Sequence, residues 1–337
     1  MKTKYYLLMI LVFTMTFNAC NKNEDDGPEL VPERDRVEQQ IEDKATLLTY
    51  LQTHYYNSGD LAGNLNPSIS DLVITELAEG ETLPIDHTFL IDDIETKTTI
   101  LLETDYEYYI LRLNQGGGEA PNFADRVRLN YSGNTLDGEI FDSSTNPVDF
   151  DLVALIPGWR RVIPQFNVSE SFIENGDGTV SYTNSGVGVM FLPSGLGYYG
   201  GGVAGISAYS SLVFKFEMFQ TEVNDHDNDG LPSYVEDLNG NLNMVDDDTD
   251  GDVFNPNYVD ADDDGDGVLT LNELEPNEYI INLGEPEPVL GAKEFEISRT
   301  EDGGIITIKT VIIMDSNNDG LDDYLDENII INYNEEG

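Results

Sequence analysis

The sequence predicts a protein of the α+β class, and three of its features support this prediction. Apolar residues recur with a helical period over 33–56, short alternating apolar runs follow up to 221, and acidic residues recur at fixed spacing beyond 222. Many short strands combined with few helices indicate α+β architecture. We expect an N-terminal region of a helix and strands over 33–116, a central domain over 117–221 and an Asp-rich C-terminal region over 222–337.

The composition allows two or three modest domains and makes the chain strongly negative. The chain has 337 residues, of which 65 are acidic and 16 are basic, and its formal net charge is −49. Such a surface repels nucleic acid and attracts cations, so we expect no nucleic-acid partner. Simple solubility is the alternative explanation of the charge, except where the acids are regularly spaced. With one cysteine, Cys20, the chain cannot form an internal disulfide.

Residues 1–20 have the features of an export signal. Lys2 and Lys4 precede an apolar stretch over 5–17, which is too short to span a bilayer comfortably and suits the core of a signal peptide. The stretch is followed by Ala19-Cys20, an ending that resembles the lipobox of bacterial lipoproteins, where the cysteine is lipidated. The resemblance implies a cell-envelope protein anchored through Cys20 at the outer membrane, on its periplasmic or its cell-surface face. An ordinary signal peptide with a chance cysteine is the alternative.

A polar tether and a helix are expected between the anchor and the first strands. The tether over 21–32 contains Pro28 and Pro32. The helix over 33–56 is predicted because one face collects Val37, Ile41, Ala45, Leu48, Leu51 and Tyr55. A Gly-, Asn- and Ser-rich loop over 57–70 and strands over 71–113 should follow. We expect the helix to serve packing or dimerisation, because no catalytic pattern lies in this region.

Alternating apolar and polar residues predict several strands and one short helix in the central domain. The helix begins at Trp159 and ends near Phe166, with Pro164 close to its end. An insertion over 170–186 contains the turn sequence Asn175-Gly-Asp-Gly, which predicts a hairpin. The predicted strands lie at 127–133, 136–144, 147–150, 188–193 and 211–217.

Four segments of the central domain resemble FKBP-type peptidyl-prolyl isomerases in their order and approximate spacing. They read NYSGNTLDGEIFDSS, IPGW, LPSGLGYYG and ISAYSSLVFKFEM, and the resemblance covers about 118–221. It implies an FKBP-like fold, in which a curved antiparallel sheet wraps around one short helix and a proline pocket lies between them. It also implies that the pocket is lined by Tyr131, Phe141, Asp142, Phe150, Ile156, Trp159, Tyr198, Ile206 and Phe214.

The resemblance gives some of these residues a role. Trp159, the only tryptophan in the chain, would form the floor under the proline ring. The Ile156 N–H and the Tyr198 hydroxyl would each hold a substrate carbonyl, and Asp142 would orient neighbouring groups or polarise the carbonyl. Any one of the aromatic residues taken alone is better explained as ordinary core. The chain departs from the family at Val148, where another aromatic residue is usual.

Prolyl isomerisation suits an apolar aromatic pocket and needs no cofactor. Rotation about an X-Pro bond has a barrier of roughly 18–20 kcal/mol, because amide resonance must be broken. The twisted transition state has lost that resonance and is less strongly solvated than the planar amide, so an apolar pocket favours it over the ground state. No nucleophile, metal or general base is evident for this step. We therefore expect an isomerase or folding helper that acts on proline-containing polypeptides.

The Asp-rich region contains three copies of a twelve-residue calcium-loop pattern. Oxygen ligands recur at alternate positions, glycine stands sixth and an acid stands twelfth. Asp246, Asp248, Asp250 and Gly251 form a partial fourth copy. The expected calcium ligands are Asp225, Asp227, Asp229, the Leu231 carbonyl and Glu236 in the first loop; Asp262, Asp264, Asp266, the Val268 carbonyl and Glu273 in the second; and Asp315, Asn317, Asp319, the Leu321 carbonyl and Asp326 in the third.

Calcium suits these loops because it accepts six to eight oxygen ligands in loose geometry. No lysine or arginine occurs between Lys215 and Lys293 to neutralise the acids. The region lacks the long flanking helices of EF-hands and resembles thrombospondin type 3 repeats, which implies structural calcium. A non-binding acidic linker is the alternative. Strands are predicted over 293–314, either as a small separate unit or packed on the central domain.

Two functions fit the chain as a whole. The first is a prolyl isomerase or folding helper anchored in the cell envelope. The second is a non-catalytic, calcium-dependent surface binding or adhesion module built on an FKBP-like fold. Turnover of a short X-Pro peptide distinguishes the two. The sequence leaves open the client proteins, the oligomeric state and the role of 33–116.

Overall fold

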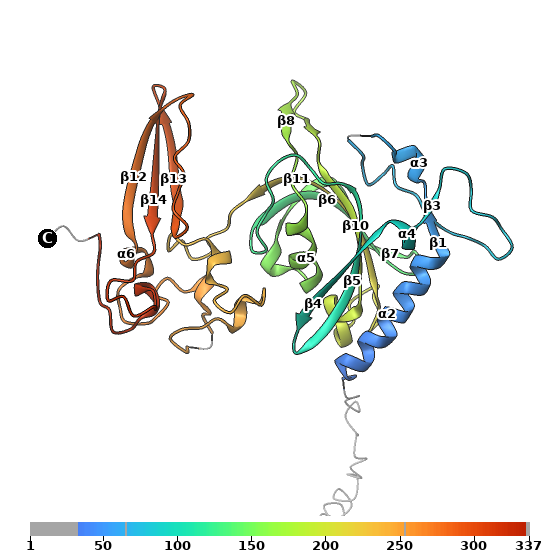
Figure 1. Ribbon diagram of the computed structural model, residues 1–337, viewed down its shortest axis with the longest axis horizontal. Helices are drawn as coiled ribbons and strands as arrows, with labels where there is room; N and C mark the ends of the chain where they lie inside the picture. The colour runs from blue at the N-terminus through green and yellow to red at the C-terminus, as the bar shows by residue number, and fades with distance from the viewer. Residues whose placement is uncertain (1–32, 65, 253, 335–337) are drawn as a thin grey trace, which may run out of the picture. The chain divides into compact units, whose positions relative to one another are not determined.

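The computed structural model of the protein describes residues 33–64, 66–252 and 254–334 (Figure 1). The predictions for 1–32, which include the signal segment, the tether and Cys20, lie outside the described residues. From Asp35 onwards the chain packs as one compact unit. Within the described ranges, no helix is both long enough and apolar enough to cross a bilayer.

The N-terminal region is a helix followed by a small three-stranded sheet. Helix α2 (Arg36–Thr53) begins after Asp35, whose carboxylate accepts the N–H groups of Val37 and Glu38 at 3.0 Å and so caps the first turn. Strand β1 then lies between β2 and β3 in an antiparallel sheet. The elements after α2 are β1 (His54–Tyr56), α3 (Ser58–Leu61), β2 (Ile74–Glu76), β3 (Thr88–Phe89) and α4 (Leu90–Asp93).

The buried face of α2 differs from the predicted one. Val37 and Ile41 are 55% and 66% exposed, whereas Gln39, Asp43 and Leu47 are buried. The prediction was wrong for the first half of the helix because that half packs through polar groups, which an apolar period cannot reveal. The second half, where Leu47 and Leu51 are fully buried, packs as an ordinary apolar face.

A six-stranded antiparallel sheet forms the largest layer of the fold (Figure 1). Its strand order is β4-β5-β10-β11-β6-β7. Because β5 pairs with β10, the sheet continues across residue 116 and takes two strands from the 33–116 region. The strands are β4 (Ile94–Leu101), β5 (Thr104–Asn114), β6 (Arg126–Thr135), β7 (Ile140–Asp151), β10 (Gly186–Leu192) and β11 (Leu212–Glu222).

Apolar side chains cover both faces of this sheet. One core lies between the sheet and α5 (Pro157–Val162) and includes Tyr108 and Phe214. The other lies under α2 and includes Leu47, Tyr109 and Phe191. Successive residues of a strand point to opposite faces, which is why Tyr108 and Tyr109 belong to different cores. Strand β10 is buried along its whole length, because both of its faces are covered.

The rest of the central domain consists of short helices and one β-hairpin, formed by β8 and β9. The predicted helix over 159–166 is observed as α5 followed by η3. The predicted hairpin in the insertion is confirmed: β8 and β9 pair, and the Asn175 N–H donates to the Thr179 carbonyl at 2.7 Å across the turn. These elements are η2 (Leu152–Ala154), η3 (Ile163–Gln165), β8 (Ser171–Glu174), β9 (Val180–Thr183), η4 (Ser194–Leu196) and η5 (Tyr199–Gly201).

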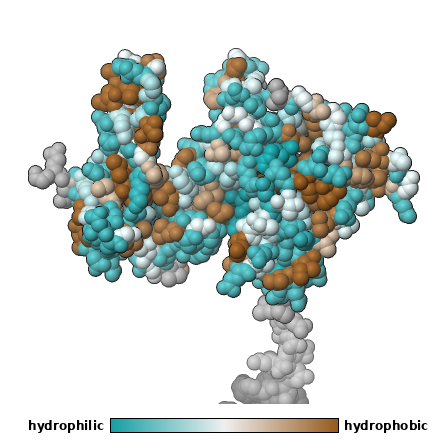
Figure 2. All heavy atoms as spheres, viewed as in Figure 1, coloured by the Kyte–Doolittle hydropathy of each residue, from teal (hydrophilic) through white to brown (hydrophobic). Residues whose placement is uncertain are grey.

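The C-terminal region combines the Asp-rich loops with a three-stranded sheet of order β12-β14-β13. Strands β13 (Glu294–Asp302) and β14 (Ile305–Ile312) confirm the strands predicted over 293–314, and β12 (Glu275–Asn282) was not predicted. Figure 2 shows hydrophobic residues at the outer end of this sheet, where Leu283 and Ile305 are exposed. The short helices of the loops are η6 (Ser233–Glu236), η7 (Met244–Asp246), η8 (Asn257–Val259), α6 (Thr270–Glu273) and η9 (Asp323–Leu325).

Asp43 connects α2 to the loop that follows β10. Its buried carboxylate accepts the Ser194 N–H at 2.7 Å and the Ser194 hydroxyl at 2.6 Å through Oδ2, and the Gln39 amide at 2.7 Å through Oδ1. Nearby, the Arg36 guanidinium lies 4.0 Å from the centre of the Tyr199 ring. Burial raises the pKa of Asp43 above its ordinary value, although the hydrogen bonds oppose this shift. Helix α2 therefore braces the segment after β10.

We expect Asp43→Ala to lower the free energy of unfolding by about 1–3 kcal/mol, because the Ser194 N–H and hydroxyl lose a buried acceptor. Asp43→Asn keeps an oxygen acceptor and should lose less. The folded-state pKa of Asp43 is raised, so the folded state binds this proton more tightly than the unfolded chain does. The stability that the proton adds is fully present below the unfolded pKa, near 3.8, and is lost as the pH rises through the folded pKa. Asp43→Asn should remove this part of the pH dependence. Urea unfolding at several pH values measures both effects.

Glu38→Ala provides the control for the Asp43 variants. Glu38 is an exposed acid on the same helix, and its replacement should change the free energy of unfolding by about 0.5 kcal/mol or less. If Asp43→Ala and Glu38→Ala unfold at the same urea concentration, Asp43 does not brace the loop.

Candidate active site and candidate calcium loops

Five of the six aromatic residues predicted for the pocket come from four elements and converge on one core. Tyr131 lies on β6, Phe141 and Phe150 on β7, Trp159 on α5 and Phe214 on β11. All five pack in or against the core between the sheet and α5. The fold therefore gathers side chains that are as much as 83 positions apart in the sequence.

The pairing of β6 with its two neighbours sets this arrangement. Gly133 of β6 stands opposite Phe214 of β11 on one side and Asp142 of β7 on the other. A Cβ atom on Gly133 would lie 2.6 Å from the Phe214 ring and 2.7 Å from the Phe141 ring, so the glycine leaves room for both rings. Those two rings meet edge to face, with centroids 5.5 Å apart.

Trp159 stands in the middle of the aromatic cluster. Its ring centroid lies 5.2 Å from Phe214, 5.8 Å from Phe150 and 6.1 Å from Tyr131, and all three contacts are edge to face. Such aromatic pairs contribute about 0.5–1.5 kcal/mol each beyond the burial of their area. Trp159 is only 3% exposed, so it belongs to the core, and its role as the floor of a pocket stays a prediction. Helix α5 supplies the position, because Pro157 in its first turn has a φ angle suited to helix initiation.

A hydrogen bond links the aromatic cluster to the one carboxylate predicted for the site. The Tyr131 hydroxyl donates to Asp142 Oδ2 at 2.6 Å. Burial, and after it this hydrogen bond, raises the pKa of the Tyr131 hydroxyl. Burial and the charge of Asp142 also raise the pKa of the Tyr198 hydroxyl. Both hydroxyls therefore remain protonated donors at neutral pH.

The other predicted pocket residues surround the same core. Ile206 is buried in it, and Ile156 and Tyr198 are half-buried against it. Val148, the departure from the family, also packs there. The structure thus brings all nine predicted residues into one neighbourhood, while their contact with substrate stays a prediction.

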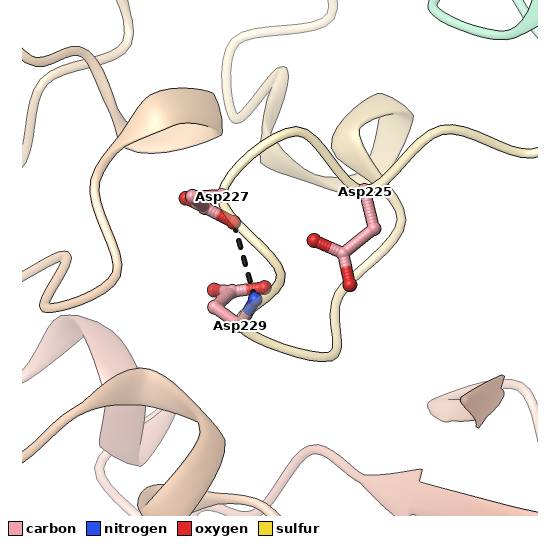
Figure 3. A group of neighbouring side chains, drawn as sticks. All are labelled: Asp225, Asp227 and Asp229. Carbon is pink, nitrogen blue, oxygen red and sulfur yellow. Dashed lines mark hydrogen bonds between the residues drawn. The ribbon is translucent and has the colours of Figure 1, made fainter. Parts of the chain in front are cut away.

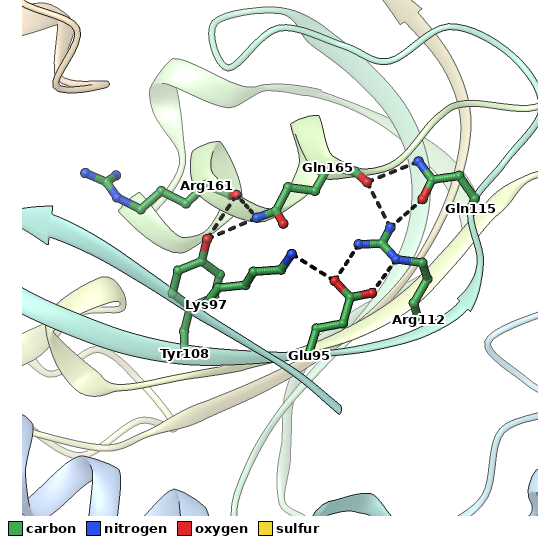
Figure 4. Close-up of polar contacts among 7 residues, drawn as sticks. All are labelled: Glu95, Lys97, Tyr108, Arg112, Gln115, Arg161 and Gln165. Atoms are coloured by element: carbon green, nitrogen blue, oxygen red, sulfur yellow. Dashed lines mark hydrogen bonds and ion pairs between the residues drawn. The ribbon is translucent and has the colours of Figure 1, made fainter. Parts of the chain in front are cut away.

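A polar network that the sequence did not predict joins the sheet to the segment after α5 (Figure 4). Arg112 donates to Glu95 at 2.6 and 3.1 Å and to the Gln165 carbonyl at 2.8 Å. The hydrogen bond from Arg112 lowers the pKa of Glu95 to about 2. The Gln165 amide also donates to the Tyr108 hydroxyl at 3.0 Å. These bonds hold α5, and with it Trp159, against the sheet.

The three Asp-rich loops share one backbone geometry. In the first loop the Gly230 N–H donates to Asp225 at 3.1 Å, the Asp229 N–H to Asp227 at 3.2 Å and the Leu231 N–H to Asp229 at 2.8 Å. The equivalent bonds measure 3.2, 3.1 and 2.7 Å in the second loop and 3.1, 2.8 and 2.9 Å in the third. Figure 3 shows the three carboxylates of the first loop gathered around its interior.

The sixth position of each loop requires glycine. Gly230, Gly267 and Gly320 have φ angles of 97°, 96° and 97°, a conformation that side chains rarely adopt. The turn lets the backbone fold back so that its N–H groups donate to the side chains at the first, third and fifth positions. The predicted spacing thus corresponds to a real local structure.

Many carboxylate oxygens in the first two loops are buried without a hydrogen-bond partner among the described residues. Both oxygens of Glu236 and both of Glu273 are among them. Burial and the neighbouring carboxylates raise the pKa of Glu236 to about 11 and that of Glu273 to about 9. The other unpartnered oxygens in these loops belong to Asp225, Asp227, Asp229, Asp262, Asp263, Asp264 and Asp266. An oxygen-rich set of this kind fits calcium.

The third loop fits a cation less well. The Asn317 amide nitrogen donates to Asp319 at 3.0 Å and to Asp326 at 3.2 Å, so it forms hydrogen bonds with two of the predicted ligands. Leu321, at the seventh position, is 44% exposed, whereas Leu231 in the first loop is fully buried.

A further loop of the same geometry was missed in the sequence. The Leu242 N–H donates to Asp237 at 2.9 Å and the Asn241 N–H to Asn239 at 3.0 Å, as in the three predicted loops. Its signal is the Asp-x-Asn-x-Asn spacing. The pattern was overlooked because Leu242, with φ 63°, replaces the usual glycine.

The partial copy predicted at Asp246, Asp248, Asp250 and Gly251 brings together a different set of carboxylates in the structure. The carboxylates that come within 4.8 Å of one another belong to Asp248, Asp250 and Asp252. Asp246 instead accepts the Asn241 and Asn243 amides at 2.8 and 2.9 Å. The prediction was wrong for Asp246 because this aspartate closes the preceding loop.

The central domain is thus an antiparallel sheet with a short helix packed on it and an aromatic cluster between them. Residues 117–219 match the family described as FKBP-type peptidyl-prolyl cis-trans isomerase. Residues 226–286 match a different family, described as BamM C-terminal, rather than the thrombospondin type 3 repeats that the sequence resembles.

Several curated relatives carry the name of the first family. An FKBP-type 22 kDa peptidyl-prolyl cis-trans isomerase of Escherichia coli K12 is 31% identical over 111 residues, which cover 32% of this chain and 47% of that protein. The isomerase FkpA of the same strain is 33% identical over 110 residues, which cover 32% and 35%. The outer membrane protein MIP of Legionella longbeachae is 24% identical over 127 residues, which cover 36% and 47%. The chain thus spans less than half the length of these relatives.

A solved structure of Escherichia coli FkpA is also similar to this chain. It is 30% identical, covers 34% of this chain and 48% of its own, and has a TM-score of 0.29. The family match and the curated relatives therefore both name an FKBP-type peptidyl-prolyl cis-trans isomerase for the central domain.

Proposed function

We propose that the central domain is a peptidyl-prolyl cis-trans isomerase that acts on proline-containing polypeptides. The observation that carries the proposal is the Trp159 indole at the base of an aromatic cluster, within the segment that matches the FKBP-type family. Phe150 and Phe214 flank the indole, so a proline ring placed on it would meet apolar surfaces at its base and sides. The site offers what a twisted prolyl bond needs, an apolar surface with few hydrogen-bond donors.

The chain's own residues would act by binding and orientation. The Tyr131–Asp142 hydrogen bond fixes the Tyr131 ring beside the pocket. The Tyr198 hydroxyl, which stays protonated because its pKa is raised, can donate to a peptide carbonyl next to the proline. The aromatic surface favours the twisted transition state, which is less strongly solvated than the planar amide. No proton is transferred and no covalent intermediate forms.

The test is catalysis of a short X-Pro peptide by the full chain. We expect the cis-to-trans rate to exceed the uncatalysed rate, and a small ligand of FKBP pockets should suppress the excess. Circular dichroism of the same sample establishes that it is folded. A folded sample that leaves the uncatalysed rate unchanged would overturn the proposal and leave the non-catalytic binding module.

The protein is further proposed to be anchored in the cell envelope through a lipid on Cys20. The support is the short apolar segment that ends at the only cysteine in the chain. Acyl chains contribute about 0.8 kcal/mol per buried methylene, so a multiply acylated cysteine holds a protein stably at a membrane. We expect Cys20→Ser to move the protein from the membrane fraction to the soluble fraction. A Ser variant that still sediments with membranes would contradict the anchor.

The first two Asp-rich loops are proposed to bind structural calcium. The support is the set of buried carboxylate oxygens for which the part of the chain that the structure describes supplies no hydrogen-bond partner. Asp225, Asp227, Asp229 and Glu236 would hold the ion in the first loop, and the Leu231 carbonyl would add a ligand. In the second loop the corresponding groups are Asp262, Asp264, Asp266, the Val268 carbonyl and Glu273.

A further inference from the structure

The two calcium loops meet at a cluster of three buried carboxylates. Asp229 and Glu236 belong to the first loop, and Asp263 belongs to the second. One oxygen of each lies within 4.8 Å of the others, although Glu236 and Asp263 are 27 positions apart in the sequence. The three side chains are 1%, 0% and 2% exposed. Asp263 is not one of the predicted ligands of either loop.

The protein supplies few partners for these charges. Asp229 accepts the Leu231 N–H at 2.8 Å, and Asp263 accepts the Thr270 hydroxyl at 3.3 Å. The remaining oxygens of Asp229 and Asp263, and both oxygens of Glu236, are buried without a hydrogen-bond partner. A buried carboxylate oxygen without a partner is costly, and three carboxylates side by side also repel one another. The sequence offers no lysine or arginine between Lys215 and Lys293 to neutralise them.

The position of Asp263 within its loop explains why it faces the first loop. Ligands of a twelve-residue loop stand at positions one, three, five and twelve, and Asp263 stands at position two. In the first loop, position two is His226, which also reaches outward: its ring nitrogen Nε2 lies 2.9 Å from Asp151 of the central domain. In all three loops the N–H at position two donates to the side chain at position nine. This shared bond turns the residue at position two away from its own ring of ligands.

The distances suit a calcium ion. Calcium binds oxygens at about 2.3–2.6 Å, so two ligands on opposite sides of one ion are up to about 5 Å apart. Oxygens that all lie within 4.8 Å of one another can therefore share an ion. Three carboxylates would surround the ion. Its positive charge would offset the repulsion that they exert on one another in its absence.

We propose that Asp263 of the second loop joins Asp229 and Glu236 of the first loop in holding one calcium ion, so that this ion fastens the two loops together. The proposal rests on calcium binding by the first loop. It adds a ligand from outside that loop and a function for the ion as a cross-link. Ordering of the first loop by calcium then requires the second loop to be in place.

The test is a calcium titration of the full chain and of Asp263→Asn, followed by hydrogen exchange of 225–236 and 262–273. In Asp263→Asn we expect protection of 225–236 to need at least about tenfold more calcium than in the wild type, because the ion loses a charged ligand. Protection of 262–273 should shift less, because Asp262, Asp264, Asp266 and Glu273 are unchanged. Asp302→Asn, at an exposed acid on β13, is the matched control and should titrate like the wild type.

Thermal unfolding of the same variants gives a second, independent signature. In chelator, Asp263→Asn should unfold at a higher temperature than the wild type, because one buried charge is gone. In calcium the order should reverse, because the wild type holds the ion more tightly. This crossing distinguishes a lost ligand from a variant that merely folds badly, which would be less stable in both conditions.

Two results would overturn the proposal. If residues 225–236 of Asp263→Asn become protected at the same calcium concentration as in the wild type, the first loop binds its ion alone and no cross-link exists. If calcium protects neither segment of the wild type, the cluster holds protons instead of a metal ion. Neither result bears on the isomerase, whose activity on an X-Pro peptide should be the same in Asp263→Asn and in the wild type.

Discussion

Protease should cut residues 225–273 quickly in chelator and slowly in millimolar calcium. Without a cation, the ordered loops hold buried carboxylate oxygens that find no hydrogen-bond partner among the described residues, and the carboxylates repel one another. A ligand that binds only the ordered state stabilises it by about 2.7 kcal/mol at a hundredfold excess over the dissociation constant. Cutting that follows opening should then slow by about a hundredfold. Extracellular calcium modules bind at about 10⁻⁴–10⁻³ M, so millimolar calcium is the relevant range.

The choice of protease and controls makes this measurement specific. Trypsin has no site between Lys215 and Lys293, so a protease that cuts at apolar residues is required. Magnesium should protect less than calcium, because it demands near-octahedral geometry. Asp264→Ala combined with Asp266→Ala should weaken the protection, and Asp302→Asn should not. Equal rates of cutting in chelator and in millimolar calcium would mean that the stretch is an acidic linker.

The calcium-loop geometry could be predicted because it is local in the sequence. Ligands at alternate positions, and a glycine where the backbone adopts a positive φ angle, leave a spacing that can be read without the fold. Gly230 and Gly267 stand at that position with φ angles of 97° and 96°. Leu242 adopts a φ angle of 63° in the same geometry, and its loop was missed because the prediction required glycine. A side chain in this conformation is strained, so a pattern based on the favoured residue overlooks it.

Tertiary contacts could not be predicted in the same way. The proximity of Asp263 to Glu236 depends on how two loops pack, and the sequence between them carries no sign of it. The buried face of α2 was also mistaken, because Asp43 is held there by polar bonds to Ser194 rather than by an apolar surface. Strand β5 was expected to belong to the N-terminal region. In the structure it pairs with β10 and so belongs to the sheet of the central domain.

The gathering of aromatic residues in the central domain could be predicted for a different reason. These residues follow one another in an order that resembles a known family. The prediction therefore came from this resemblance and not from residue periodicity. Their geometry supports the prediction: Tyr131, Phe150 and Phe214 all meet Trp159 within 6.1 Å, measured between ring centroids. The Arg112–Glu95 pair that holds α5 in place could not be predicted in this way. A basic and an acidic residue on neighbouring strands are common, and their positions in the sequence do not show that they pair.

Trp159→Ala should lower kcat/KM for an X-Pro peptide by at least about tenfold, which corresponds to about 1.4 kcal/mol of lost transition-state binding. The indole is the floor of the proposed pocket, and alanine would remove the apolar surface against which the proline ring rotates. The same change should lower the free energy of unfolding by about 3–5 kcal/mol, because Trp159 is 3% exposed and its loss leaves a cavity. Stability and activity must therefore be measured together.

Two further variants separate the loss of the pocket from the loss of the fold. Trp159→Phe keeps a ring in the cluster, so it should retain more stability and more activity than Trp159→Ala. Phe172→Ala removes an aromatic ring that is 50% exposed on the β8–β9 hairpin, and it should leave both quantities near their wild-type values. Because Trp159 is the only tryptophan, its fluorescence should also change when a peptide binds the wild type. A folded Trp159→Ala protein with the wild-type kcat/KM would place the catalytic surface elsewhere, since the indole is the largest side chain in the cluster.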